Sequence, residues 1–294
     1  MNLKYQFYKG YYNTFDPRIF QEEQPKKEVA DYNAGTFREK NNIMLGYQPT
    51  CTELDALKIT KDQFGEQLRQ FILETAYPGL VSGTGYTHET GNTGEFKIGF
   101  HFDHTTGLPY LPGHSIKGAI RNAFPRYEQP RTSEDKQIKD AKASYILQLL
   151  GLESKVPAGK QCDWVHRLEK HLFEAYFPES VSGSTEHKRQ QDIFLDARIC
   201  KAGASGCIVG MDAITPHGDK IWKNPIPLPF LKVLPGVSWE FSFLLHPVKL
   251  DGIDICSDTK CGLFLDILQE QGLGAKTNVG YGQFKSLPSN PFKS

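Results

Sequence analysis

The segment from Val237 to Leu245 alternates between apolar and polar side chains, and this pattern sets the first limit on the fold. Successive side chains of a strand point to opposite faces, so a period of two predicts a strand with one buried face. The chain must therefore contain a sheet and a layer that covers it. The apolar positions are Val237, Trp239, Phe241, Phe243 and Leu245.

Other periodic segments place further strands and helices around this one. The residues from Ile59 to Tyr77 predict a helix that runs into a strand. Ser115 is expected to cap its helix and Pro125 to stop it, and Gly272 is expected to end the last helix. The predicted strands are Ile98–Asp103, Ile193–Ile199, Cys207–Ala213 and Asn278–Leu287, and the predicted helices are Ser115–Phe124, Glu134–Gly151, Asp163–Phe177 and Cys261–Gln271. This order predicts an α+β fold, closest to the ferredoxin-like or RNA-recognition-motif topology.

The chain of 294 residues, 39% of them hydrophobic, is large enough to bury a substantial core. Residues 1–60 are rich in aromatic side chains and show no sustained period, which predicts an irregular, packed extension that covers a neighbouring surface. We expect residues 61–294 to form one elaborated domain, with a helical insertion at about 126–191. The residues from Ser180 to Gln191 predict a polar, basic loop.

Charge and cysteine usage exclude several classes of protein. Lys and Arg total 34, as do Asp and Glu, which argues against a strongly basic protein that binds nucleic acid alone. The six cysteines are widely spread and Met1 to Tyr8 contains no apolar core of a signal peptide, which predicts a reduced, cytoplasmic protein. No window approaches about eighteen consecutive apolar residues, so we expect no contact with a membrane.

The most distinctive segment is the glycine-rich stretch Gly272–Gly282. Glycines allow a close backbone approach, and Lys276, Thr277, Asn278 and free N–H groups offer donors to phosphate oxygens. The stretch is not a Walker A loop, because Ala275 stands where glycine is needed, nor is it a dinucleotide-binding fingerprint. From Gly272 to Ser294 there are three Lys and no acidic residue, which favours an anionic ligand. A glycine-rich hairpin that closes the fold remains an alternative.

A second distinctive segment, Gly107–Arg121, is a proline-stiffened turn that leads into a helix. We expect the first N–H groups of this helix, Ser115 and Lys117 to converge on one ligand, with Arg121 on the same helix face as Lys117. Between Pro112 and Lys142 there are seven Lys or Arg and four Asp or Glu, which gives this segment a net charge of +3. A solvated, charged helix face is the alternative interpretation of that excess.

These two segments, together with Pro78–Gly85 and Asp192–Ala197, resemble the RAMP superfamily of CRISPR-associated proteins, and within it the sixth subunits of type III-B (Cmr) effector complexes. The resemblance covers residues 70 to 286. It implies a ferredoxin-like, non-catalytic subunit of an antiviral ribonucleoprotein that holds CRISPR RNA and presents it to complementary target RNA, alongside other RAMP subunits. It implies no cofactor and no metal.

The RNA-binding residues expected from these segments lie in the two glycine-containing turns. His114 departs from the family, where a second Ser is common. Tyr281, like Tyr110, lies where a base could stack on its ring. The expected RNA-binding residues are His114, Ser115, Lys117, Arg121, Gly274, Lys276, Thr277, Asn278, Gly280 and Tyr281.

Two other functions remain open from the sequence. His101, His104 and His114 are candidates for general acid–base cleavage of RNA without metal, and the paired glycines also resemble the CRISPR-RNA-processing endoribonucleases of the superfamily. The other alternative is a structural cap that contacts only proteins. Asp103, Asp192 and Asp196 are candidate acids or metal ligands, although turn capping or pairing with Arg is commoner. Cys256 with Cys261, and Cys162 with His166, lack the paired spacing of a zinc site.

Overall fold

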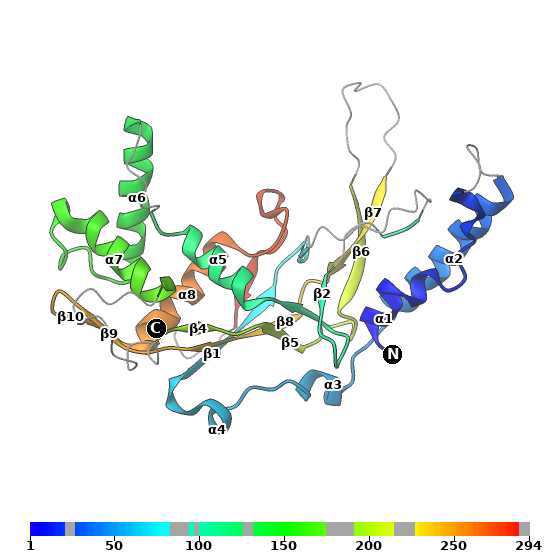
Figure 1. Cartoon of the computed structure of the whole chain (residues 1–294), viewed down its shortest axis with the longest axis horizontal. Coiled ribbons are helices and arrows are strands. Elements are labelled where there is room, and N and C mark those ends of the chain that lie inside the picture. Colours follow the sequence, from blue (N-terminus) through cyan, green and yellow to red (C-terminus); the bar gives the residue numbers. More distant parts are fainter. Residues whose placement is uncertain are drawn as a thin grey trace.

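The chain folds as an α+β protein, described by a computed structural model for residues 1–20, 27–82, 94–96, 100–125, 132–174, 191–214 and 227–287 (Figure 1). The helices are α1 (Leu3–Tyr8), α2 (Lys27–Leu45), α3 (Cys51–Asp55), α4 (Lys61–Phe64), α5 (Gly113–Asn122), α6 (Ser133–Leu149), α7 (Gln161–Glu174) and α8 (Ser257–Gln271). The strands are β1 (Leu68–Thr75), β2 (His101–Phe102), β3 (Pro109–Leu111), β4 (Ile193–Phe194), β5 (Ala197–Lys201), β6 (Val209–Ile214), β7 (Leu228–Val233), β8 (Ser238–Leu244), β9 (Val248–Leu250), β10 (Ile253–Ile255) and β11 (Phe284–Ser286).

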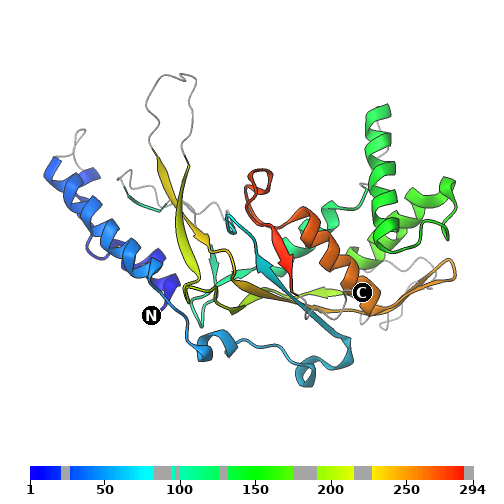
Figure 2. The ribbon, with the colours of Figure 1, turned by 180° about the vertical axis from the view of Figure 1, so that it is seen from behind.

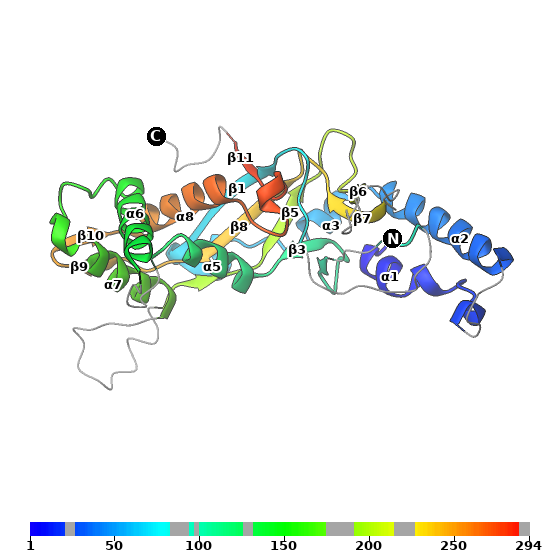
Figure 3. The ribbon, with the colours of Figure 1, turned by 90° about the horizontal axis from the view of Figure 1, so that it is seen from above.

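The main sheet has the strand order β11-β1-β8-β5-β3-β2, with β4 also paired to β8. All of its pairings are antiparallel. Helices α5 and α8 lie over one face of the sheet, while α3 and α4 lie on the other (Figures 1 and 3). Strand β8 is central, which agrees with the strand predicted from its alternating sequence.

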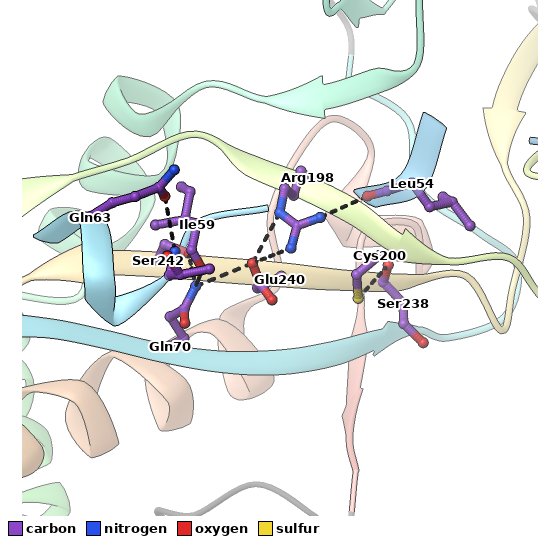
Figure 4. Close-up of polar contacts among 10 residues, drawn as sticks. Leu54, Ile59, Gln63, Gln70, Arg198, Cys200, Ser238, Glu240 and Ser242 are labelled. Atoms are coloured by element: carbon purple, nitrogen blue, oxygen red, sulfur yellow. Dashed lines mark hydrogen bonds and ion pairs between the residues drawn. The ribbon is translucent and has the colours of Figure 1, made fainter. Parts of the chain in front are cut away.

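The alternation in β8 separates an apolar from a polar face. Trp239, Phe241 and Phe243 are buried, and the ring of Phe243 lies 5.3 Å from that of Phe264 on α8. On the opposite face, Glu240 accepts a hydrogen bond of 2.6 Å from Arg198 of β5 (Figure 4). The Arg198 guanidinium also donates to the Leu54 carbonyl of α3, so the polar face is covered by the segment that leads from α3 to β1.

Helices α6 and α7 form the described part of the expected insertion. One buried ion pair joins α8 to the chain just before β4: Lys260 Nζ lies 2.6 Å from Asp192 Oδ2. Burial raises the pKa of Asp192 and lowers that of Lys260, although each charge partly offsets this effect on the other. Such a pair fixes geometry more than it adds stability, because both charges lose their hydration.

A two-stranded ribbon, β6 with β7, stands away from the main sheet, and helices α1 and α2 lie beside it (Figure 2). Aromatic side chains of the N-terminal segment enter the core. Phe7 and Tyr11 are each 1% exposed, and the ring of Tyr11 stacks on those of Phe7 and of Phe37 on α2. The expectation of a covering extension is therefore correct for these side chains. The expectation that residues 1–60 are irregular is wrong, since α2 alone is a helix of 19 residues.

Other predicted elements differ in detail. The predicted strand Ile193–Ile199 is broken, because β4 ends at Phe194 and β5 begins at Ala197. Asn278–Leu287 is a strand only over β11 and begins in a 3-10 turn. Most of the predicted basic loop lies outside the described residues, as do Gly83 and Gly85. No helix in the described part of the chain is long and apolar enough to span a membrane.

Candidate functional site

Helix α5 begins differently from the sequence prediction. Its N-cap is Pro112, which has no side-chain hydrogen-bonding group, and Ser115 lies inside the first turn instead of capping it. The cap comes from elsewhere in the chain, because the Gly113 N–H donates a hydrogen bond of 2.7 Å to Asp196 Oδ1. A Cβ on Gly113 would lie 2.1 Å from the Phe194 carbonyl oxygen, so only glycine fits where α5 meets β4.

The glycine-rich stretch is joined through its backbone to the segment that follows β1. Ala275 N–H donates to the Val81 carbonyl at 2.7 Å, and Gly282 N–H donates to the Gly79 carbonyl at 2.8 Å. A Cβ on Gly274 would lie 2.5 Å from the Val81 oxygen, and its φ is +107°. The glycines at 274 and 282 therefore serve close packing of two backbone segments, and the N–H groups of Ala275 and Gly282 are not free for phosphate. This corrects the expectation of free N–H groups for these two residues alone.

A cleft of about 420 Å³ separates α5 from the glycine-rich stretch. Ser115 comes from the second motif, while Gly274 and Thr277 come from the C-terminal one, so the fold brings the two motifs to one place. The described residues that line the cleft are Ser82, His101, Leu111, Pro112, Ser115, Ala119, Asn122, Gln271, Gly272, Leu273, Gly274 and Thr277. Sequence analysis missed Asn122, although its spacing from Ser115 and Ala119 places it on the same helix face.

The basic residues of α5 do not join Ser115 at the cleft. Lys117 Nζ lies 6.0 Å from the centre of the Phe194 ring. Arg121 forms ion pairs with Glu169, at 2.6 Å, and with Glu174, both on α7. The expected convergence of Ser115 and Lys117 is wrong, because residues two apart on a helix point to different sides. Lys117 and Arg121 do share one face, and it is the face that meets β4 and α7.

The outer part of the glycine-rich stretch is more accessible. Asn278 is exposed, and Lys276 and Gly280 are half-buried. Lys276 has a left-handed backbone, with φ of +61°. The adjacent side chain of Tyr281 is held instead by the ribbon: its hydroxyl donates to Asp212 on β6 at 2.6 Å, and its ring lies 5.9 Å from Lys232 Nζ. Burial, and then the Asp212 carboxylate, raise the pKa of Tyr281.

The candidate histidines have different surroundings. His101 lines the cleft, and burial, then the nearby His114, lower its pKa, while Asp196 acts in the opposite direction. A lowered pKa favours the neutral imidazole, the form that accepts a proton. His114 is exposed at the start of α5. His104 Nδ1 instead lies 2.9 Å from Lys4 Nζ of α1.

The candidate acids make structural contacts and, with the other described residues, do not form a metal site. Asp103 accepts hydrogen bonds from the backbone of Thr105 and Thr106 and stabilises a turn. Asp192 pairs with Lys260, as described above, and Asp196 caps α5. Asp192 precedes β4 and Asp196 lies between β4 and β5, so neither carboxylate belongs to a strand. Among the residues that the structure describes, no three His, Cys, Asp or Glu side chains are grouped so as to hold a metal ion.

The fold and the cleft define an α+β protein in which an antiparallel sheet supports a helix N-terminus opposite a glycine-rich turn. The RAMP superfamily matches residues 72–285, and the chain belongs to this family. The chain is 28% identical over 212 residues to the CRISPR system Cmr subunit Cmr6 of Pyrococcus furiosus, an alignment that covers 60% of this chain and spans 58% of the length of that relative. It is 25% identical over 266 residues to the Cmr6 subunit of Saccharolobus solfataricus, over 88% of this chain and 70% of the relative.

A solved structure shares the fold. The type III-B Cmr-beta complex bound to cognate target RNA contains a chain that matches with a TM-score of 0.54 and 18% sequence identity, over 96% of this chain and 84% of that chain. The similarity therefore includes most of the segment before residue 61.

Proposed function

We propose that the chain is a non-catalytic RNA-binding and assembly subunit of a type III-B CRISPR effector complex. In this role it holds CRISPR RNA and helps present it to complementary target RNA, together with other RAMP subunits, in antiviral defence. The observation that carries the proposal is the meeting of two family segments, the start of α5 and the glycine-rich stretch, on either side of one cleft. The Cmr6 relatives and the fold shared with a chain of an RNA-bound Cmr-beta complex support it.

The topology of the core is part of this proposal. Strands β1, β5, β8 and β11 and helices α5 and α8 follow one another in the chain as βαββαβ, and the four strands lie side by side as β11-β1-β8-β5. This order supports a ferredoxin-like core, in which one sheet carries both helices on one face. We attribute strands β2, β3 and β4, the ribbon, and helices α6 and α7 to additions around that core.

The distribution of charge suits a shared RNA channel better than independent binding. The net charge is +0, and Arg121 is already paired with two carboxylates. Lys276 lies on the glycine-rich stretch beside the cleft, whereas Lys117 lies on the face of α5 that meets β4, and each would contact the sugar–phosphate backbone. Because such contacts carry no sequence information, target choice would come from base pairing with the guide.

The test is RNA retention by the full chain, alone and assembled with its partner subunits. Lys117→Ala and Lys276→Ala should each weaken retention by about 1 kcal/mol or less, and the double variant should show a smaller dependence on salt. The matched control is Lys249→Ala, which removes an exposed lysine from β9. Thermal unfolding checks that the loss of the Lys117 contact with Phe194 has not unfolded α5. Unchanged retention in the double variant at physiological salt would overturn the proposal, and binding without salt dependence would favour a protein-only cap.

A metal-independent endoribonuclease is the second candidate, favoured by one observation. His101 lines the cleft with a lowered pKa, and His114 lies close enough to contribute to that shift. Incubation of the full chain with CRISPR repeat RNA in the presence of a chelator separates the two functions. If the chain cleaves the RNA at a fixed position and His101→Ala abolishes this cleavage, the protein is a processing nuclease and not a non-catalytic binding subunit.

A further inference from the structure

The cleft between α5 and the glycine-rich stretch has an unusual lining for a site beside RNA. None of its described lining residues is Lys, Arg, Asp or Glu, and His101 is the one titratable side chain among them. Positive charge supplies most of the affinity for a nucleic-acid backbone. A helix N-terminus can also bind phosphate, but the Asp196 carboxylate already caps that of α5. The interior of this cleft is therefore poorly suited to a phosphate group.

The same lining is well suited to a nucleobase. Asn122 and Gln271 have amide groups that both donate and accept hydrogen bonds, as the edge of a base requires. Ala119 and Leu273 provide apolar surface for the faces of a ring. Unpaired bases of single-stranded RNA are recognised in this way, by contact with their faces and by hydrogen bonds to their edges.

Three polar side chains of the cleft are available to a ligand. Within the described residues, no hydrogen bond joins the side chains of Ser115, Asn122 or Thr277 to another protein group. They come from both walls, Ser115 and Asn122 from α5 and Thr277 from the glycine-rich stretch. The volume of about 420 Å³ is in the range of clefts that bind small organic groups.

We propose that one unpaired nucleobase of the bound RNA, with its ribose, enters this cleft and is contacted by Asn122 and Thr277. The neighbouring phosphates remain outside, near Lys276, the half-buried lysine of the same turn. This inference rests on the proposed RNA-binding function and adds to it a position at which the protein contacts a base directly. A loop of a partner protein is the competing occupant. It is less favoured, because Lys276 next to the cleft suits the phosphates that accompany a base.

The test compares two RNA probes with the full chain. One probe is single-stranded oligouridine. The other has the same length and the same sugar–phosphate backbone, but each ribose lacks its base. Affinities are measured by fluorescence anisotropy for the unaltered chain and for the double variant Asn122→Ala with Thr277→Val. The control is Asn42→Ala, which alters an exposed asparagine of α2. Thermal unfolding verifies that every variant is folded.

We expect the double variant to bind oligouridine about ten-fold more weakly than the unaltered chain, which is the loss typical of one base contact. It should bind abasic RNA as well as the unaltered chain does. The ratio of the affinity for oligouridine to the affinity for abasic RNA should thus be about ten-fold smaller in the double variant than in the unaltered chain. In Asn42→Ala this ratio should be unchanged.

The outcomes separate this inference from the function on which it rests. If the chain binds both probes and the double variant loses the same factor on each, the cleft does not read a base and this inference is overturned alone. If the variant binds both probes normally but assembles less well with other subunits, the occupant is a protein segment. If neither probe binds to the chain, alone or assembled, the proposed function fails and this inference fails with it.

Discussion

Gly118 and Gly113 lie on the same helix, but the fold requires only one of them. At Gly113 a Cβ would clash with the Phe194 carbonyl, whereas no described atom lies within 4 Å of the position of a Cβ on Gly118. Gly118 is also exposed, one turn beyond Ser115. A glycine inside a helix lowers stability, and the described residues give no packing reason for the one at 118.

The substitution Gly118→Ala should therefore separate stability from binding. We expect it to raise the free energy of unfolding by about 0.5–1 kcal/mol, because alanine is the better helix former. RNA binding should weaken several-fold if the sugar–phosphate backbone lies against this part of α5. The measurements are urea unfolding and RNA anisotropy on the same protein. Gly113→Ala, the comparison, should destabilise the chain. A destabilised Gly118→Ala variant would contradict this account.

Single residues also show what sequence reasoning could not reach. Ser115, Gly274 and Thr277 were named as candidate residues, and all three line the cleft. Sequence gave no indication that Arg121 is paired, because its partners Glu169 and Glu174 are 48 and 53 residues away and lie on another helix. Local spacing predicts neighbours within one element, whereas contacts between elements depend on the packing of the whole fold.

At the scale of elements, strongly periodic segments predicted the right helix or strand, whereas weakly periodic segments did not. The strand from Val237 to Leu245 and the helix that ends at Gly272 agree with β8 and α8 within a few residues. Helix α2 was missed because its aromatic and polar residues show no clear apolar stripe. Strand β3 was missed because its proline and its glycine-rich surroundings are typical of a turn.

The junction between the ribbon and the glycine-rich stretch is a contact between elements from which a pH dependence of stability is expected. Asp212 of β6 accepts hydrogen bonds from Lys232, at 2.7 Å, and from Tyr281, at 2.6 Å. Burial acts to raise the pKa of Asp212, but these hydrogen bonds outweigh it and hold the pKa below its ordinary value of 3.8. Such a carboxylate stabilises the fold above its unfolded-state pKa, and the contribution disappears as the pH falls through the lower, folded-state pKa.

We therefore expect Asp212→Asn to lower the free energy of unfolding at neutral pH. The difference from the unaltered chain should shrink as the pH falls from about 4 to about 2, because the native carboxylate is then protonated as well. Thermal unfolding as a function of pH measures this difference. Asp254→Asn is the control, since that carboxylate lies on β10 with its side chain 76% exposed. A difference that stays constant over this range would show that Asp212 does not hold the junction through its charge.

For the molecule as a whole, the packing of the N-terminal segment decides whether the sheet has a complete core. Tyr11 is 1% exposed, and its ring stacks on Phe37 at 4.8 Å. Its hydroxyl donates to Asn41 Oδ1 at 2.7 Å and accepts a hydrogen bond from the Phe96 N–H at 2.9 Å. Phe96 belongs to the stretch between β1 and β2. Tyr11 thus links both N-terminal helices to the rest of the protein.

Tyr11→Ala should consequently destabilise the entire chain and not merely release its N-terminus. Truncation of a fully buried aromatic side chain costs about 3–5 kcal/mol, and here it also leaves the Phe96 N–H without its acceptor. Tyr5→Ala is the matched control, because Tyr5 is 49% exposed and its loss should change stability by about 0.5 kcal/mol or less. One cooperative urea transition, shifted in Tyr11→Ala alone, would show that the N-terminal segment and the sheet unfold together. A separate early transition, with the main transition unmoved, would instead make the first helices an independent unit available to a partner.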